Sequence, residues 1–155
     1  MFKHILVPLD GSELAETALP LARELARGFD AAVTLFSVAR PPYLAVEVGG
    51  HAYTELLTDL RSQVRLETEQ YLGRWQRRLQ AEGRVVHQRI VEGEPVAELI
   101  LDAVEDAGID GIVMSTHGRG GVSRWVFGSV ADKVLQQATV PVLLVRAQEQ
   151  EGPEV

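Results

Sequence analysis

The chain of 155 residues is 46% hydrophobic and 24% charged, proportions that are ordinary for a single globular domain. Its formal net charge of −7, without any block rich in lysine or arginine, argues against nucleic acid and anionic membranes as partners. The absence of cysteine excludes disulfides, thiol catalysis and cysteine-bound metals.

The first elements expected along the chain are a strand, a helix and a second strand. Residues 5–9 form a continuous apolar run, which is typical of a strand buried in a parallel sheet. The turn Asp10-Gly11-Ser12 supplies an N-cap, and apolar residues at helical spacing then predict one helix that ends at Gly28. Pro20 falls inside this helix and is expected to bend it. Residues 33–38 predict the second strand.

The middle of the chain predicts an irregular connection, a long helix and an exposed strand. Residues 40–50 contain paired prolines and paired glycines, so we expect no regular structure there. A long helix ending at Gly83 follows, and we expect its apolar stripe to belong to the core. The stripe consists of Leu57, Leu60, Val64, Tyr71, Trp75 and Leu79. The polar residues within 84–91 predict a strand at a sheet edge or in a partly exposed position.

The last third predicts a helix that begins near Pro95 and ends at Gly108, then a strand over 109–114. A helix over 129–138 and a strand over Val140–Val145 complete the pattern. Together the elements amount to five strands that alternate with four helices. They predict an α/β domain with a parallel sheet and helices on both faces.

We expect this single domain to cover residues 1–147 and the acidic segment 148–155 to be a frayed tail. No signal-peptide pattern or apolar run of about 20 residues is present, so we expect a cytoplasmic protein. Ligands of such sheets bind beyond the carboxyl ends of the strands. Asp10 and Ser115 both follow or end a predicted strand, which predicts one site there.

The most informative motif is Ser115-Thr116-His117-Gly118, followed by Gly128-Ser129 at the start of a helix. Glycines let backbone N–H groups approach an anion, and a helix N-terminus adds unpaired donors and the positive end of its dipole. A strand, a glycine-rich turn and a helix start therefore predict a phosphate site. The alternative hypothesis is a flexible turn without a ligand.

This spacing resembles the ATP-binding branch of the universal stress protein family. That branch carries glycine, two residues, glycine, nine residues, and glycine followed by serine or threonine; Gly118, Gly128 and Ser129 match it, whereas Ser115 replaces the first glycine. The resemblance extends to residues 5–12 and to the closing 141–145. It implies a Rossmann-like sheet of order 3-2-1-4-5, as in the adenine nucleotide alpha-hydrolase-like group.

The resemblance also implies a binding role for particular residues. The phosphate end would consist of Gly118, Arg119, Gly128, Ser129 and Val130, with His117 as a further candidate. The adenosine end would consist of Pro8, Leu9, Asp10, Val38, Met114 and Ser115. In that arrangement the backbone of Val38 meets adenine and Asp10 accepts hydrogen bonds from ribose or the adenine amine. Serine at position 115 would narrow the pocket, or would be strained if its φ had to be positive.

Other chemistries fit the sequence less well. A P-loop motif and a hydrolase nucleophile elbow are both absent, and the four histidines show no metal-ligand spacing. The segment 118–123 resembles a dinucleotide fingerprint that lacks its acidic residue. Adenylylating enzymes of the related group carry a serine-glycine-glycine loop after the first strand, which Asp10-Gly11-Ser12 does not match.

We therefore expect an ATP-binding stress-response protein that regulates through its bound nucleotide, without fast turnover because no catalytic base is identified. ADP and AMP are alternative ligands, and any Mg²⁺ would be bound by the phosphates of the nucleotide. The alternative hypothesis is a dimeric interaction module of the same fold that has lost nucleotide binding, which the replacement of the first motif glycine by Ser115 would indicate. The apolar edge strand Val140–Val145 predicts a homodimer, as the resemblance also implies.

Overall fold

The centre of the molecule is a five-stranded parallel sheet with strand order β3-β2-β1-β4-β5. The computed structural model describes residues 1–41, 51–116 and 128–146, so the predicted tail 148–155 lies outside the described residues. The strands are β1 (His4–Pro8), β2 (Ala32–Ala39), β3 (Val86–Glu92), β4 (Gly111–Thr116) and β5 (Val142–Arg146). The expected sheet, its order and the edge position of β3 are confirmed.

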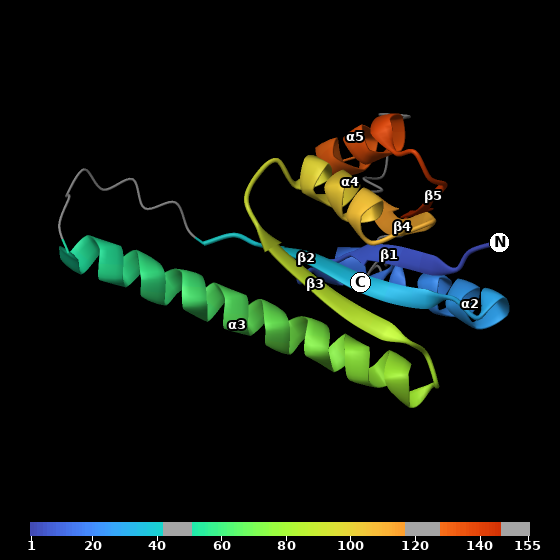
Figure 1. Cartoon of the computed structure of the whole chain (residues 1–155), viewed down its shortest axis with the longest axis horizontal. Coiled ribbons are helices and arrows are strands. Elements are labelled where there is room, and N and C mark those ends of the chain that lie inside the picture. Colours follow the sequence, from blue (N-terminus) through green and yellow to red (C-terminus); the bar gives the residue numbers. More distant parts are fainter. Residues whose placement is uncertain (42–50, 117–127, 147–155) are drawn as a thin grey trace, which may run out of the picture.

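Helices cover both faces of this sheet (Figure 1). They are α1 (Glu13–Glu16), α2 (Leu19–Phe29), α3 (His51–Ala81), α4 (Val96–Asp106) and α5 (Ser129–Gln137). One core cluster joins α1, α2 and α3 to residues such as Val7 and Leu35, and the other joins α4 and α5 to Leu6 and Phe36. Because neighbouring strand residues point to opposite faces, each strand contributes to both cores, which explains the continuous apolar runs.

The first helix differs from its prediction, because the chain forms two helices where one was expected. The break lies at Thr17, whose backbone N–H and hydroxyl both donate to the carbonyl of Leu14 at 3.2 and 2.7 Å. Pro20 then lies in the first turn of α2, where a proline replaces an N–H that has no helical partner. α2 continues past Gly28 to Phe29, and Asp30 ends it with a positive φ of 54°.

The long helix α3 has two different halves. Its C-terminal half packs on the sheet and buries Leu72 and Leu79. Its N-terminal half projects beyond the sheet (Figure 1), and the stripe residues Leu57, Leu60 and Val64 are only half-buried and belong to neither core cluster. The predicted core stripe is therefore confirmed only toward the C-terminal end, because the sheet is too short to cover the rest.

Two strand boundaries differ from the sequence-based expectation. β4 covers Gly111–Thr116 instead of 109–114, and it follows a turn in which Gly108 has a φ of 62°. β5 covers Val142–Arg146 instead of 140–145.

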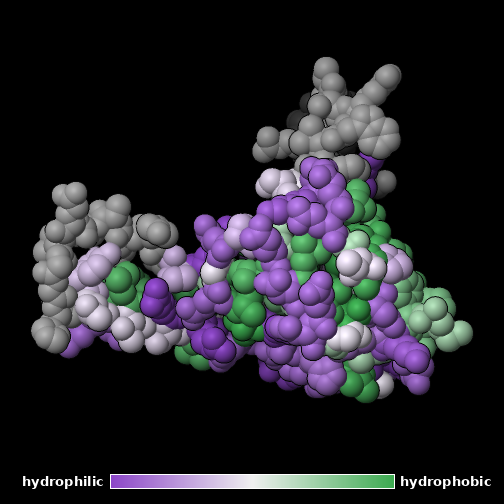
Figure 2. All heavy atoms as spheres, turned by 45° about the horizontal axis from the view of Figure 1, so that its top comes forward, coloured by the Kyte–Doolittle hydropathy of each residue, from purple (hydrophilic) through white to green (hydrophobic). Residues whose placement is uncertain are grey.

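The face in Figure 2 is largely hydrophilic, with hydrophobic residues in separate patches. No helix in the described part of the chain is both long and apolar enough to cross a bilayer.

Candidate functional site

A cavity of about 890 Å³ lies over the carboxyl ends of β1, β2 and β4. Every predicted site residue that the structure describes lines it. These residues are Pro8, Leu9, Asp10, Val38, Met114, Ser115, Gly128, Ser129 and Val130. The other three predicted residues, His117, Gly118 and Arg119, lie outside the described residues. The topological prediction of one site at this edge of the sheet therefore agrees with the position of the cavity.

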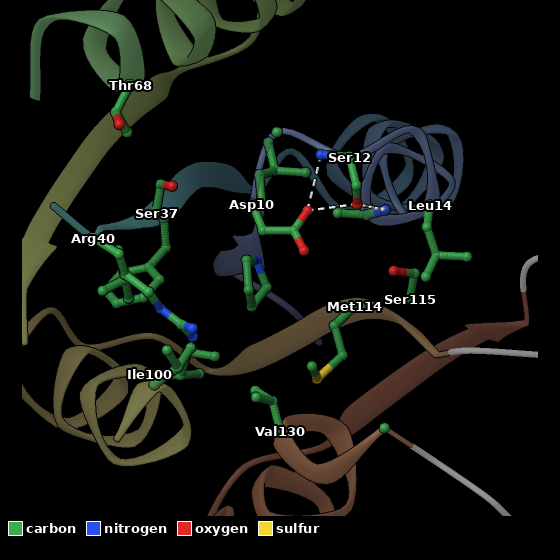
Figure 3. A pocket seen from close by; sticks show the side chains of 18 of the residues that line it. Asp10, Ser12, Leu14, Ser37, Arg40, Thr68, Ile100, Met114, Ser115 and Val130 are labelled. Carbon is green, nitrogen blue, oxygen red and sulfur yellow. Dashed lines mark hydrogen bonds between the residues drawn. The ribbon is translucent and has the colours of Figure 1, made fainter. Parts of the chain in front are cut away.

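Asp10 is held in place by its own turn. The backbone N–H and the hydroxyl of Ser12 both donate to Oδ1 of Asp10, at 2.9 and 2.5 Å. The same hydroxyl accepts a hydrogen bond from the backbone N–H of Ala15 at 3.1 Å, and so caps α1. Gly11 permits the turn with a φ of 85°. Only Oδ1 is used by described residues, so Oδ2 remains available as an acceptor at the cavity (Figure 3).

The N-terminus of α5 forms the opposite wall. Gly128 is its N-cap, with φ −55° and ψ 149°, and no side chain of the described residues caps this helix end. The first helical bond runs from Asp132 N–H to the carbonyl of Gly128 at 2.9 Å, so the N–H groups of the preceding turn have no helical acceptor. Ser129 and Val130 of that turn line the cavity. N–H donors without a helical acceptor and a positive dipole end make this wall suitable for an anion.

Ser115 does not have the strained conformation that was considered for it. It lies within β4 and pairs with Val145 of β5, and Asp30 is the only described residue other than glycine with a positive φ. Serine is therefore compatible with the backbone at this position, so backbone strain gives no reason to expect that ligand binding has been lost. Next to it, the buried hydroxyl of Thr116 has no hydrogen-bond partner among the described residues.

The sequence-based prediction missed the wall formed by α3. Val64, Thr68 and Tyr71 line the cavity at helical spacing, and Glu67 lies between them. The pattern assigned Val64 and Tyr71 to the core, because a helical stripe cannot show where the sheet beneath it ends. Thr68 donates its hydroxyl to the carbonyl of Val64 at 2.8 Å, so its oxygen still has lone pairs that can accept a hydrogen bond.

Tyr71 connects this wall to α1. Its hydroxyl is buried and has no hydrogen-bond partner among the described residues. Burial, and next the nearby carboxylate of Glu16, raise the pKa of the Tyr71 phenol, so the group stays neutral. The Glu16 carboxylate accepts a hydrogen bond from Trp75 Nε1 at 3.2 Å. Tyr71 and Trp75 also pack against the core cluster, as the sequence predicted.

The lining chemistry is therefore divided. The side that faces α4 and α5 is mainly apolar, with Phe36, Val38, Val96, Ile100 and Met114. The Asp10 carboxylate and the backbone N–H donors of α5 border this apolar side. Within the described ranges, no three histidine, cysteine or acidic residues gather into a metal site. Such a cavity suits a ligand with an anionic end, hydroxyl or amine donors, and a flat apolar part.

Comparisons with known proteins agree with this architecture. The model of the universal stress protein family matches residues 1–146. The universal stress protein MJ0531 of Methanocaldococcus jannaschii is 32% identical over 152 residues, which cover 97% of this chain and 86% of the relative.

Two solved structures extend the comparison. The hypothetical protein MJ0577 superposes with a TM-score of 0.78 at 29% identity, over 97% of this chain and 99% of the other. A universal stress protein from Archaeoglobus fulgidus in complex with dAMP gives a TM-score of 0.62 at 19% identity, over 93% and 97%. The similarity to the dAMP complex shows that the two proteins share a fold.

Proposed function

Since this chain belongs to the universal stress protein family, we propose that it binds an adenine nucleotide, ATP, in the cavity and acts in the cytoplasm as a nucleotide-dependent stress-response protein. One observation carries the proposal. Asp10, with one oxygen that no described residue uses, and the N-terminus of α5, which no described side chain caps, both line one cavity beyond the strand ends. A hydrogen-bond acceptor and an anion site in one cavity match the two polar parts of a nucleotide.

Each part of ATP has a counterpart in this arrangement. The phosphates meet the N–H groups at the start of α5, and a Mg²⁺ ion is held by the phosphates. The ribose hydroxyls or the adenine amine donate to Asp10, and the base lies on the apolar side near Val38 and Met114. The dAMP complex of a protein with the same fold supports an adenine nucleotide as the ligand class.

The direct test is a ligand measurement on the purified protein. Mass analysis of the material released by denaturation identifies a co-purified nucleotide, and calorimetric titration of the stripped protein with ATP, ADP and AMP gives their affinities. Saturable binding of one nucleotide per chain is expected. The proposal is wrong if no adenine nucleotide co-purifies and none binds at millimolar concentration.

The bound nucleotide is proposed to act as a regulatory ligand and not as a rapidly consumed substrate. Phosphoryl transfer requires a group that orients the attacking water or takes its proton, beyond the groups that hold phosphate. We identify no described residue for that role. Steady-state hydrolysis should fall far below the ~1–10³ s⁻¹ of ordinary enzymes. A rate inside that range that disappears in Gly128→Asp would contradict this part of the proposal.

We also propose a homodimer formed through β5. This strand is an edge of the sheet, and the side chains of Val142, Leu143, Leu144 and Val145 are only half-buried in one chain. Antiparallel pairing of two such edges about a two-fold axis satisfies their backbone groups and covers the apolar strand. Light scattering at micromolar concentration should give the mass of two chains, whereas a monomer would rule this interface out.

A further inference from the structure

Arg40 is the only positively charged residue among the described residues that line the cavity. It directly follows β2, and its side chain is exposed. It forms no hydrogen bond or salt bridge with another described residue. In Figure 3 its guanidinium group points away from the strand end and into the cavity, toward Ile100. The Arg40 guanidinium is thus exposed to solvent at the cavity and is not engaged by any other described residue, so it is available to a ligand.

The surface beneath this guanidinium group is apolar. Ile100 of α4 is fully buried and belongs to the same core cluster as Phe36 and Met114, which also line the cavity. No carboxylate contributed by α4 lines the cavity within the described ranges. The Arg40 side chain and this apolar surface therefore border the same part of the cavity, which offers a ligand a cationic group beside an apolar wall. A flat aromatic ring matches both features.

The position of Arg40 separates it from the anion site. The donors of α5 come from its first turn, which begins at Ser129 and includes Val130, whereas Arg40 directly follows β2 (Figure 3). Asp10 comes two residues after β1, the strand that separates β2 from β4 in the sheet. A nucleotide whose phosphates lie at α5 therefore brings its base, and not its phosphates, to Arg40.

We propose that the Arg40 guanidinium stacks on the base of the bound nucleotide and makes the cavity selective for ligands that carry an aromatic base. This inference rests on the proposed nucleotide-binding function and deepens it. Stacking of a guanidinium on an aromatic ring changes affinity by about 2- to 30-fold. Lysine does not replace it, because an ammonium group is not planar and is more strongly hydrated.

The test compares Arg40→Met and Arg40→Lys with the unchanged protein by calorimetric titration with AMP, ADP and ATP at 150 mM salt. Methionine keeps most of the length of the side chain and removes both the charge and the plane. Arg61→Met on α3 is the matched control. Arg61 is exposed and does not line the cavity, so its loss measures the general effect of one fewer positive charge. Thermal unfolding without ligand should be unchanged in all three variants.

The expected result is a 2- to 30-fold loss in Arg40→Met that is about the same for AMP, ADP and ATP, because all three carry the same base. Arg40→Lys should recover only part of the loss. A loss that grows with the number of phosphates, after correction by Arg61→Met, would show a phosphate contact and overturn the proposal. Full affinity in Arg40→Met also overturns it, while leaving nucleotide binding intact. A wild-type protein that binds none of the three ligands refutes both proposals.

Discussion

At the amino end of the sheet the polar groups satisfy one another, whereas at the carboxyl end several of them have no partner among the described residues. Asp110, just before β4, accepts hydrogen bonds from the backbone N–H groups of Lys3 and His4 at 2.7 and 3.0 Å, and the His4 ring bonds to the hydroxyl of Thr34 at 2.7 Å. At the other end, described residues engage only one oxygen of Asp10, and none of their side chains caps α5.

This contrast separates groups that stabilise the fold from groups that are available to a ligand. A polar group that is already paired contributes to stability and gains little from a ligand, whereas an unpaired one gains a partner when the ligand arrives. Asp10 and Asp110 show the difference in two residues of the same type. The same substitution at these two positions should therefore change two different measurements.

The largest expected effect follows Gly128→Asp. The backbone angles of Gly128 suit any residue, and aspartate is a strong N-cap, so the folded protein should be as stable as before or slightly more stable. A carboxylate at the proposed phosphate position repels the ligand by about 3–4 kcal/mol at contact distance, and ATP affinity should fall by about 100-fold or more. Titration with ATP and thermal unfolding measure the two effects separately.

Gly128→Asn is the matched control for this variant, since asparagine also caps the helix but carries no charge. It should keep the stability and lose much less affinity than the aspartate variant. Equal ATP affinity in Gly128→Asp and the unchanged protein would remove α5 from the site.

The second effect is a loss of affinity in Asp10→Asn. Asparagine can keep the Oδ1 bonds to Ser12 and so preserve the turn, while the free carboxylate oxygen becomes an amide nitrogen that cannot accept. A lost hydrogen bond to a charged group costs about 1.5–3 kcal/mol, so ATP should bind about 10- to 100-fold more weakly. Unfolding should change little, and unchanged ATP affinity would exclude Asp10 as a ligand contact.

The third prediction concerns Asp110→Asn, a substitution at the amino end of the sheet. One of the two oxygens that accept from Lys3 and His4 becomes a donor and faces a backbone N–H. The protein should lose about 1–2 kcal/mol of stability in urea unfolding, because one bond is lost and one N–H is left unpaired. ATP affinity should stay within twofold of the original. A larger change in affinity than in stability would mean that the two ends are not independent.

The smallest effect is a pH dependence that arises from His4. Burial, and then the neighbouring His87, lower the pKa of the His4 ring below its usual 6.5, while the Asp110 carboxylate opposes this shift. The unfolded chain therefore takes up the proton first, and stability falls as the pH drops through 6.5 toward the folded pKa. Urea unfolding between pH 7.5 and 5.5 should show this loss, and His4→Gln should reduce it. An unchanged pH gradient in His4→Gln would assign the dependence to another group.

The parts of the site that the sequence predicted are those carried by short local motifs. Asp10 and Ser12 form a turn whose spacing is visible in the chain, and Gly128-Ser129 marks a helix start. Arg40 and Tyr71 were missed, because a charge after a strand resembles an ordinary solvated side chain and an aromatic residue in a helical stripe resembles core. Their role depends on neighbours that are far away along the chain.

The sequence by itself determined the order of strands and helices, apart from the break between α1 and α2, because periodicity and turn residues act over a few positions. The glycine spacing also placed the candidate anion site. Only the tertiary structure decided that Ser115 belongs to a regular strand, that one oxygen of Asp10 is free, and that α3 and Arg40 border the same cavity. Those facts depend on how the helices pack across the sheet, and packing is set by contacts between residues that are remote in sequence.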